Sequence, residues 1–148
     1  MEVVDTDSMQ QANLSEELKS QLQDILSGII STLDVYDVIK DDDQYYIVNL
    51  KNNEIIFENI HLSVVANIIA SALNTGEEVS HTAIDNMLKY ENNAISKMVE
   101  CQIYEQLSSE ATDYEKGTLY EIKLQEAELK SQSAIDHLLR NAENILPA

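Results

Sequence analysis

The chain has 148 residues, of which 44% are apolar and 24% are charged, and its nine Lys and Arg against 27 Asp and Glu give a formal net charge of −18. A chain of this length forms one domain with a substantial hydrophobic core. The charge argues against direct binding to nucleic acid or to an anionic membrane, because both depend on Lys and Arg contacts with phosphate. The single cysteine, Cys101, excludes an internal disulfide and a four-cysteine zinc site.

The N-terminal region is acidic and polar and lacks apolar periodicity, so we expect a flexible acidic arm over residues 1–12. It has no basic start followed by an apolar run, and no stretch of the chain reaches the ~20 apolar residues that cross a bilayer. We therefore expect a cytoplasmic protein without a membrane contact. Residues 13–148 are expected to form a single domain, with a helix, meander and helix over 13–76 and a long helical hairpin over 77–148.

A first amphipathic helix is expected over residues 14–33. Asn13 and Glu16 have the spacing of a capping box. Apolar residues then recur at intervals of three and four, namely Leu14, Leu18, Leu22, Ile25, Leu26, Ile29, Ile30 and Leu33. Gly28 weakens this helix by ~1 kcal/mol relative to alanine, so the helix depends on packing of its apolar stripe.

The next segments are rich in β-branched and aromatic residues and are short enough for strands. They cover 35–39, 45–50 and 54–57, separated by the polar turns 41–43 and 51–53. This order predicts a three-stranded antiparallel meander. A sheet this small needs a helix packed against it to be stable.

Two helices follow. The first covers 62–73 and ends before Gly76, which suits the left-handed position after a helix. Ser80 is expected to cap the second, which runs from 81 to about 112. The segment 113–117 is expected to interrupt the helical pattern.

The last helix carries the clearest repeat in the chain. Its seam alternates in steps of four and three residues through Tyr120, Leu124, Ala127, Ser131, Ala134, Leu138, Asn141 and Ile145. The small residues in the middle of this seam allow a neighbouring helix to approach closely. We therefore predict an α+β fold that is predominantly α: an N-terminal helix, a small three-stranded antiparallel meander, a short helix, and a long antiparallel helical hairpin.

No motif indicates a catalytic centre. Glu58 with His61, and Glu78 with His81, have the Glu-x-x-His spacing of di-iron bundles, but both pairs fall in loops or at helix beginnings. We expect surface histidines there. The three glycines are isolated, so no phosphate-binding loop is expected. The sequence thus predicts a non-enzymatic protein without catalytic residues, metal ligands, cofactor or small-molecule substrate.

The tyrosines provide a stronger indication, because tyrosine supplies a large, rigid contact area with a polar tip. They serve either as half-buried anchors of the core or as a protein interface on the hairpin. The candidate interface residues are Tyr90, Tyr104, Tyr114, Tyr120, Ala127, Ser131 and Ala134. They predict an acidic interaction module that binds a protein partner or self-assembles, as a small subunit or accessory component of a larger assembly.

Charge supports an alternative function. Residues 77–143 carry 14 acidic and six basic side chains. Such a surface either keeps the protein soluble or imitates nucleic acid and inhibits a basic DNA- or RNA-binding protein.

Lysine outnumbers arginine eight to one, as is common in AT-rich genomes. This bias favours a phage or viral origin, which would place the protein in the host cytoplasm or the virion, as a virion or host-takeover protein.

Overall fold

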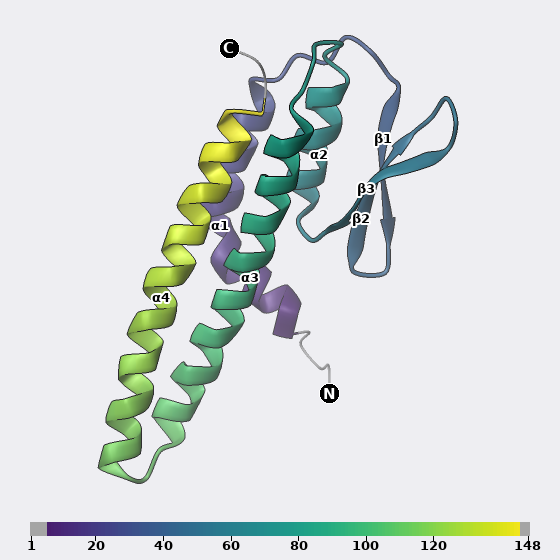
Figure 1. Cartoon of the computed structure of the whole chain (residues 1–148). Helices are drawn as coiled ribbons and strands as arrows, with labels where there is room; N and C mark the ends of the chain where they lie inside the picture. The colour runs from purple at the N-terminus through teal and green to yellow at the C-terminus, as the bar shows by residue number, and fades with distance from the viewer. Residues whose placement is uncertain (1–5, 146–148) are drawn as a thin grey trace.

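The computed structural model describes residues 6–145, with side chains from residue 16 onward. It confirms the predicted α+β class, which is mostly helical (Figure 1). A helix is followed by three strands, a short helix and two long helices that pack on each other. These elements are α1 (Thr6–Ser27), β1 (Tyr36–Asp41), β2 (Gln44–Asn49), β3 (Glu54–Ile60), α2 (Ser63–Leu73), α3 (His81–Glu110) and α4 (Tyr114–Glu143).

Helix α1 differs from the predicted helix at both ends. Residues 6–12, predicted as an arm, are helical, and Asn13 lies inside the helix instead of capping it, whereas residues 1–5 lie outside the described part of the chain. At the other end α1 stops at Ser27, six residues earlier than predicted. The amide groups of Gly28 and Ile29 donate to the carbonyl oxygens of Ile25 and Leu26 at 3.1 and 3.0 Å, which tightens the last turn.

The segment after α1 runs beside the C-terminal end of α2, where Asn74 holds it. The carbonyl oxygen of Asn74 accepts from Thr32 N and Leu33 N at 3.0 and 2.8 Å. Its side-chain Oδ1 accepts from Val35 N and Tyr36 N, both at 3.0 Å, and its Nδ2 donates to Tyr36 O at 2.8 Å. The bonds to Thr32 and Leu33 satisfy two amides that a helix extended to residue 33 would have paired internally, and the side-chain bonds fix the start of β1.

The three strands form the predicted antiparallel meander in the order β1-β2-β3. Asp41 pairs with Gln44, and Asp42 between them has a φ of 56°, a left-handed conformation that Asp tolerates in tight turns. The register shifts along the β2–β3 pair, and Asn59 in β3 has a φ of 61°. One face of the sheet is buried through Ile47, Phe57 and Ile60.

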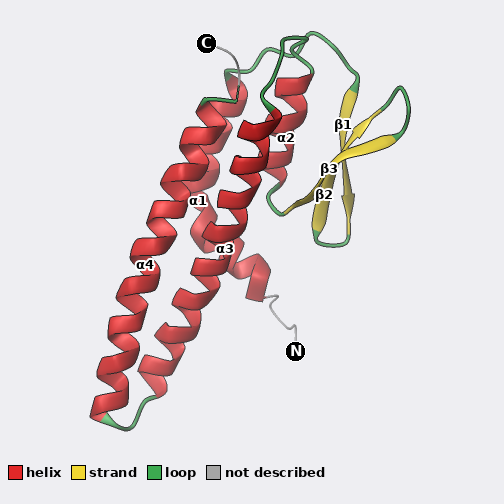
Figure 2. Ribbon diagram, in the orientation of Figure 1, coloured by secondary structure: helices red, strands yellow, loops and turns green. Residues whose placement is uncertain are grey.

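Helix α2 forms the centre of the core. It contacts α1 and all three strands, and it lies between the sheet and the long helices (Figure 2). Seven of its eleven residues are buried: Val64, Val65, Ala66, Ile68, Ile69, Ala70 and Ala72. The rest of the core is supplied by the buried face of the sheet, by α1, by the N-terminal half of α3 and by the C-terminal half of α4, for example through Leu22, Ile84 and Leu138.

The predicted helical hairpin is confirmed, and α3 and α4 share the most extensive contact in the molecule. Ser80 caps α3 as predicted, its Oγ accepting from Ala83 N at 3.2 Å. Asp113 caps α4, its Oδ1 accepting from Glu115 N at 2.9 Å. This cap starts α4 early, so the connection is only 111–113, and residues 114–117, predicted to interrupt the helical pattern, form the first turn of α4. Within the described residues, no helix is both long and apolar enough to span a membrane.

Candidate interaction surface of the helical hairpin

The predicted small-residue seam packs inside the hairpin. Ala127, Ser131 and Ala134 are buried in α4, and so is Leu138 one turn further along. Helix α3 is the element that contacts α4 most. The close approach that these residues permit is therefore made to the chain's own α3.

We expect Ala134→Phe to lower the free energy of unfolding by about 1–3 kcal/mol, because the seam has no room for an aromatic ring. Chemical denaturation followed by circular dichroism measures the change. Ser133→Phe, at the neighbouring exposed position, is the matched control and should change stability by no more than about 0.5 kcal/mol. Equal effects of the two substitutions would contradict the packing described here.

Burial is confined to one half of the hairpin. The buried residues of α3 lie between Ile84 and Ala94, and those of α4 between Ala127 and Ala142. Every residue from 95 to 126 is at least partly exposed. We call residues 95–126 the distal hairpin. It projects away from the sheet and ends at the α3–α4 turn (Figure 1).

Large apolar side chains remain exposed on and next to the distal hairpin. Tyr114, at the start of α4, is 87% exposed. Further along α4, Leu119, Ile122 and Leu129 are also exposed, with Leu129 at 74%. Their spacings of three and seven residues place them on one face of the helix. We call these three residues the α4 stripe, and it lies on a different face from the buried seam.

The four candidate tyrosines divide into two groups. The ring of Tyr90 is half-buried and stacks on His137, with 4.7 Å between the ring centroids. It therefore packs within the folded body. Tyr104 and Tyr120 are half-buried on the distal hairpin, and Tyr114 is almost fully exposed at its turn. These three are the predicted interface residues that lie on the distal hairpin with part of their surface exposed.

The charges of the hairpin are mostly acidic and seldom paired. In the described part of the chain the ion pairs are Lys97 with Glu100 at 3.0 Å and Lys123 with Glu126 at 3.8 Å. Both pairs are partly solvated, so each contributes at most about 1 kcal/mol to stability. Most hairpin carboxylates thus add to a negative surface.

A buried carboxylate that sequence reasoning missed lies in the other half of α3. Glu91 is fully buried, and its Oε1 and Oε2 accept from His61 N at 2.9 Å and Leu62 N at 3.1 Å. Leu62 is the N-cap position of α2 and its side chain makes no capping hydrogen bond, whereas Glu91 satisfies the amides of the two residues that precede the helix. Burial raises the pKa of Glu91 from 4.5 to about 7, although the two backbone hydrogen bonds oppose the shift. In the sequence, Glu91 stands at a position of the apolar repeat formed by Ile84, Met87 and Ala94. That position was the available signal that its side chain is buried.

The histidines of the two Glu-x-x-His pairs have different surroundings. The His81 ring lies against Phe57, with 5.4 Å between centroids, and His61 contacts Glu91 only through its main-chain amide. Between residues 6 and 145, no group of three or more His, Cys, Asp or Glu is arranged to hold a metal ion. Burial, followed by the charges of Glu128, Glu100 and Glu105, raises the pKa of the Cys101 thiol, which keeps the thiol protonated and weakly nucleophilic.

Comparisons of the chain with protein-family models, with curated proteins and with solved structures find no match.

Proposed function

We propose that this chain is a non-enzymatic, acidic protein-interaction module that acts as a small subunit or accessory component of a larger assembly and binds its partner along the distal hairpin. The observation that carries the proposal is that residues 95–126 contain no fully buried side chain, although they form two long helices. Apolar helical surface of this kind is stabilised when another protein covers it.

The size and chemistry of the surface support this proposal. Covering one exposed leucine contributes about 1.5–3 kcal/mol, so the α4 stripe and Tyr114 can supply most of the energy of a moderate contact. Each long helix has 30 residues, equivalent to about 45 Å of length, which is sufficient for a contact along the hairpin. The lysine-rich, arginine-poor composition favours a phage or viral assembly as the setting, in the host cytoplasm or the virion.

The test removes the stripe without disturbing the core. In the double variant Ile122→Gln and Leu129→Gln, both side chains are exposed, and glutamine is a good helix former. We expect unchanged thermal stability and at least about tenfold weaker association, measured by sedimentation velocity of the purified chain and by co-purification from the encoding organism. Gln125→Ala on the same helix is the control. Association that survives the double variant, or a wild-type chain that neither self-associates nor retains a partner, would refute the proposal.

The unpaired carboxylates of the hairpin favour a second candidate function, a nucleic-acid mimic that inhibits a basic DNA- or RNA-binding protein. The dependence of binding on ionic strength distinguishes the two proposed functions. Binding through carboxylates weakens steeply between low and high salt, because the Debye length shortens from about 30 Å at 0.01 M to about 3 Å at 1 M. Binding through the α4 stripe changes little. Affinity measured for one partner at two salt concentrations distinguishes them.

A further inference from the structure

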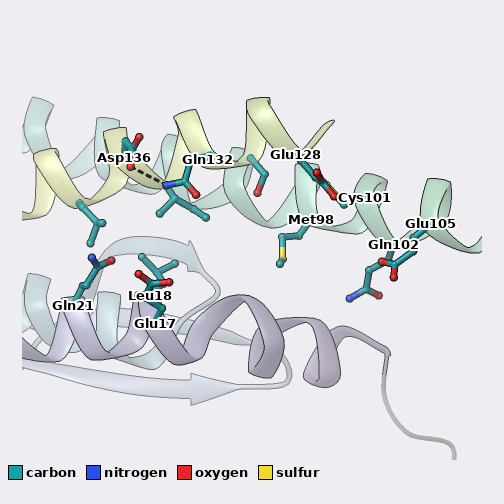
Figure 3. A pocket seen from close by; sticks show the side chains of 13 residues that line it. Glu17, Leu18, Gln21, Met98, Cys101, Gln102, Glu105, Glu128, Gln132 and Asp136 are labelled. Atoms are coloured by element: carbon teal, nitrogen blue, oxygen red, sulfur yellow. Dashed lines mark hydrogen bonds between the residues drawn. The ribbon is translucent and has the colours of Figure 1, made fainter. Parts of the chain in front are cut away.

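A groove of about 500 Å³ lies between α1, α3 and α4 (Figure 3). None of the α4 stripe residues lines it. Its volume is within the range of small-molecule sites. Apolar side chains from all three helices contribute to its lining, including Leu18, Met98 and Ile135. The groove therefore offers apolar contact to a ligand that would lie along it.

Carboxylates lie at both ends of this groove. Glu105 and Glu128 lie near Cys101 at one end, Glu17 and Asp136 lie at the other, and Met98 lies between them (Figure 3). No lysine or arginine is present among the described residues that line it. Glu128 and Asp136 are eight positions apart on α4, equivalent to about 12 Å along the helix. The groove thus has two negative ends joined by an apolar middle.

Two further observations point to a ligand. Ser131 lines the groove and is only 5% exposed, and its hydroxyl makes no hydrogen bond to any described residue. A buried hydroxyl without a partner costs free energy, which a ligand that donates a hydrogen bond would recover. In addition, burial, followed by the charges of Glu128, Glu100 and Glu105, raises the pKa of the Cys101 thiol, so negative charge acts at this end of the groove.

We propose that this groove binds a linear polyamine, a chain of methylene groups with protonated amines at its ends and along its length. The terminal ammonium groups would bind the carboxylates at the two ends, and the methylene groups would pack on Met98 and its apolar neighbours. An amine between the ends would donate to Ser131 Oγ. A single metal cation matches one end only, whereas an extended triamine spans the distance between them. The residues of the groove are not those of the α4 stripe, although Met98, Cys101 and Glu105 belong to the distal hairpin.

The test is calorimetric titration of the full chain with spermidine, and separately with Mg²⁺ at the same ionic strength. We expect spermidine to bind more tightly than Mg²⁺, and Glu128→Gln to weaken spermidine binding about fivefold. Glu121→Gln removes the same charge from the same helix seven residues earlier, outside the groove, and should leave the affinity unchanged. Since Glu121 and Glu128 are both exposed, both variants should fold.

Three results would overturn the inference. Equal weakening by Glu121→Gln and Glu128→Gln would show a diffuse attraction to the acidic surface. Spermidine affinity no greater than that of Mg²⁺ would remove the role of the methylene chain. Binding of a helical peptide with two lysines seven residues apart, without binding of spermidine, would assign the groove to a protein. The double variant of the α4 stripe should bind spermidine normally, so the two proposals can fail separately.

Discussion

Replacing Glu91 with glutamine is expected to raise the stability of the protein relative to wild type much more at pH 8 than at pH 4.5. The pKa of Glu91 is 4.5 when the chain is unfolded and about 7 when it is folded. Between these values the folded state holds a proton that the unfolded state has lost, so stability decreases as the pH rises and is level above pH 7. The total loss is about 3 kcal/mol, at about 1.4 kcal/mol for each pKa unit. Glutamine is neutral like the protonated acid and avoids this loss, but its amide nitrogen cannot accept from a backbone amide, so one of the two hydrogen bonds of Glu91 is lost at every pH.

Urea denaturation of both proteins at a series of pH values measures the effect, because the difference between them isolates Glu91 from the other carboxylates. Glu110→Gln, an exposed position at the end of the same helix, controls for the loss of one negative charge. Glu91→Ala should be about 2–4 kcal/mol less stable than Glu91→Gln at every pH, because it leaves a cavity and two unpaired amides. A stability difference between wild type and Glu91→Gln that does not vary with pH would contradict the assignment.

The second large effect is expected at Asn74. Asn74→Ala removes three side-chain hydrogen bonds to Val35 and Tyr36, at a position that is 8% exposed. Each bond contributes about 1 kcal/mol, and the backbone groups left behind are partly buried, so we expect a loss of about 3 kcal/mol in the free energy of unfolding. Thermal and urea denaturation both measure it.

Asn67→Ala is the matched control, because Asn67 lies on the same helix with its side chain exposed. Its effect should stay within about 0.5 kcal/mol. Asn74→Asp keeps the acceptor for Val35 N and Tyr36 N but loses the donor to Tyr36 O, so it should fall between wild type and Asn74→Ala. If Asn67→Ala and Asn74→Ala destabilise equally, Asn74 does not hold the α1–β1 segment.

Much of the architecture could be predicted because its signals are local. Three strand-like segments separated by Asp- and Asn-rich turns have one simple connection, and Ser80 marks the start of α3 by its own hydrogen bond. The small residues of the α4 seam correctly indicated a closely packed neighbour. The error at α1 arose because Ile29, Ile30 and Leu33 continue the helical period beyond Gly28. The hydrogen bonds from Asn74, which hold the segment after α1 outside the helix, come from about 40 positions away. The local apolar period could not predict them.

The candidate sites were less predictable for the same reason. The bonds of Glu91 join residues 29 and 30 positions apart, and in the sequence Glu91 stands beside two asparagines like any solvated acid. The acidic groove needs side chains from three helices, whose relative placement no spacing rule supplies. Among the predicted interface residues, periodicity identified Ala127, Ser131 and Ala134 as contact positions but could not distinguish contact within the chain from contact with a partner.

The contact of Glu91 with the residues that precede α2 has a consequence for the order in which the molecule assembles. The short helix is synthesised well before the acid that accepts from the amides of His61 and Leu62, so on the ribosome these two amides lack their partner until the first third of α3 has emerged. A nascent chain stopped before residue 91 should therefore be open to proteolysis, whereas a slightly longer one with α3 in place should begin to resist it. The sheet and the long helices, although they look like separate lobes, should for this reason become stable together.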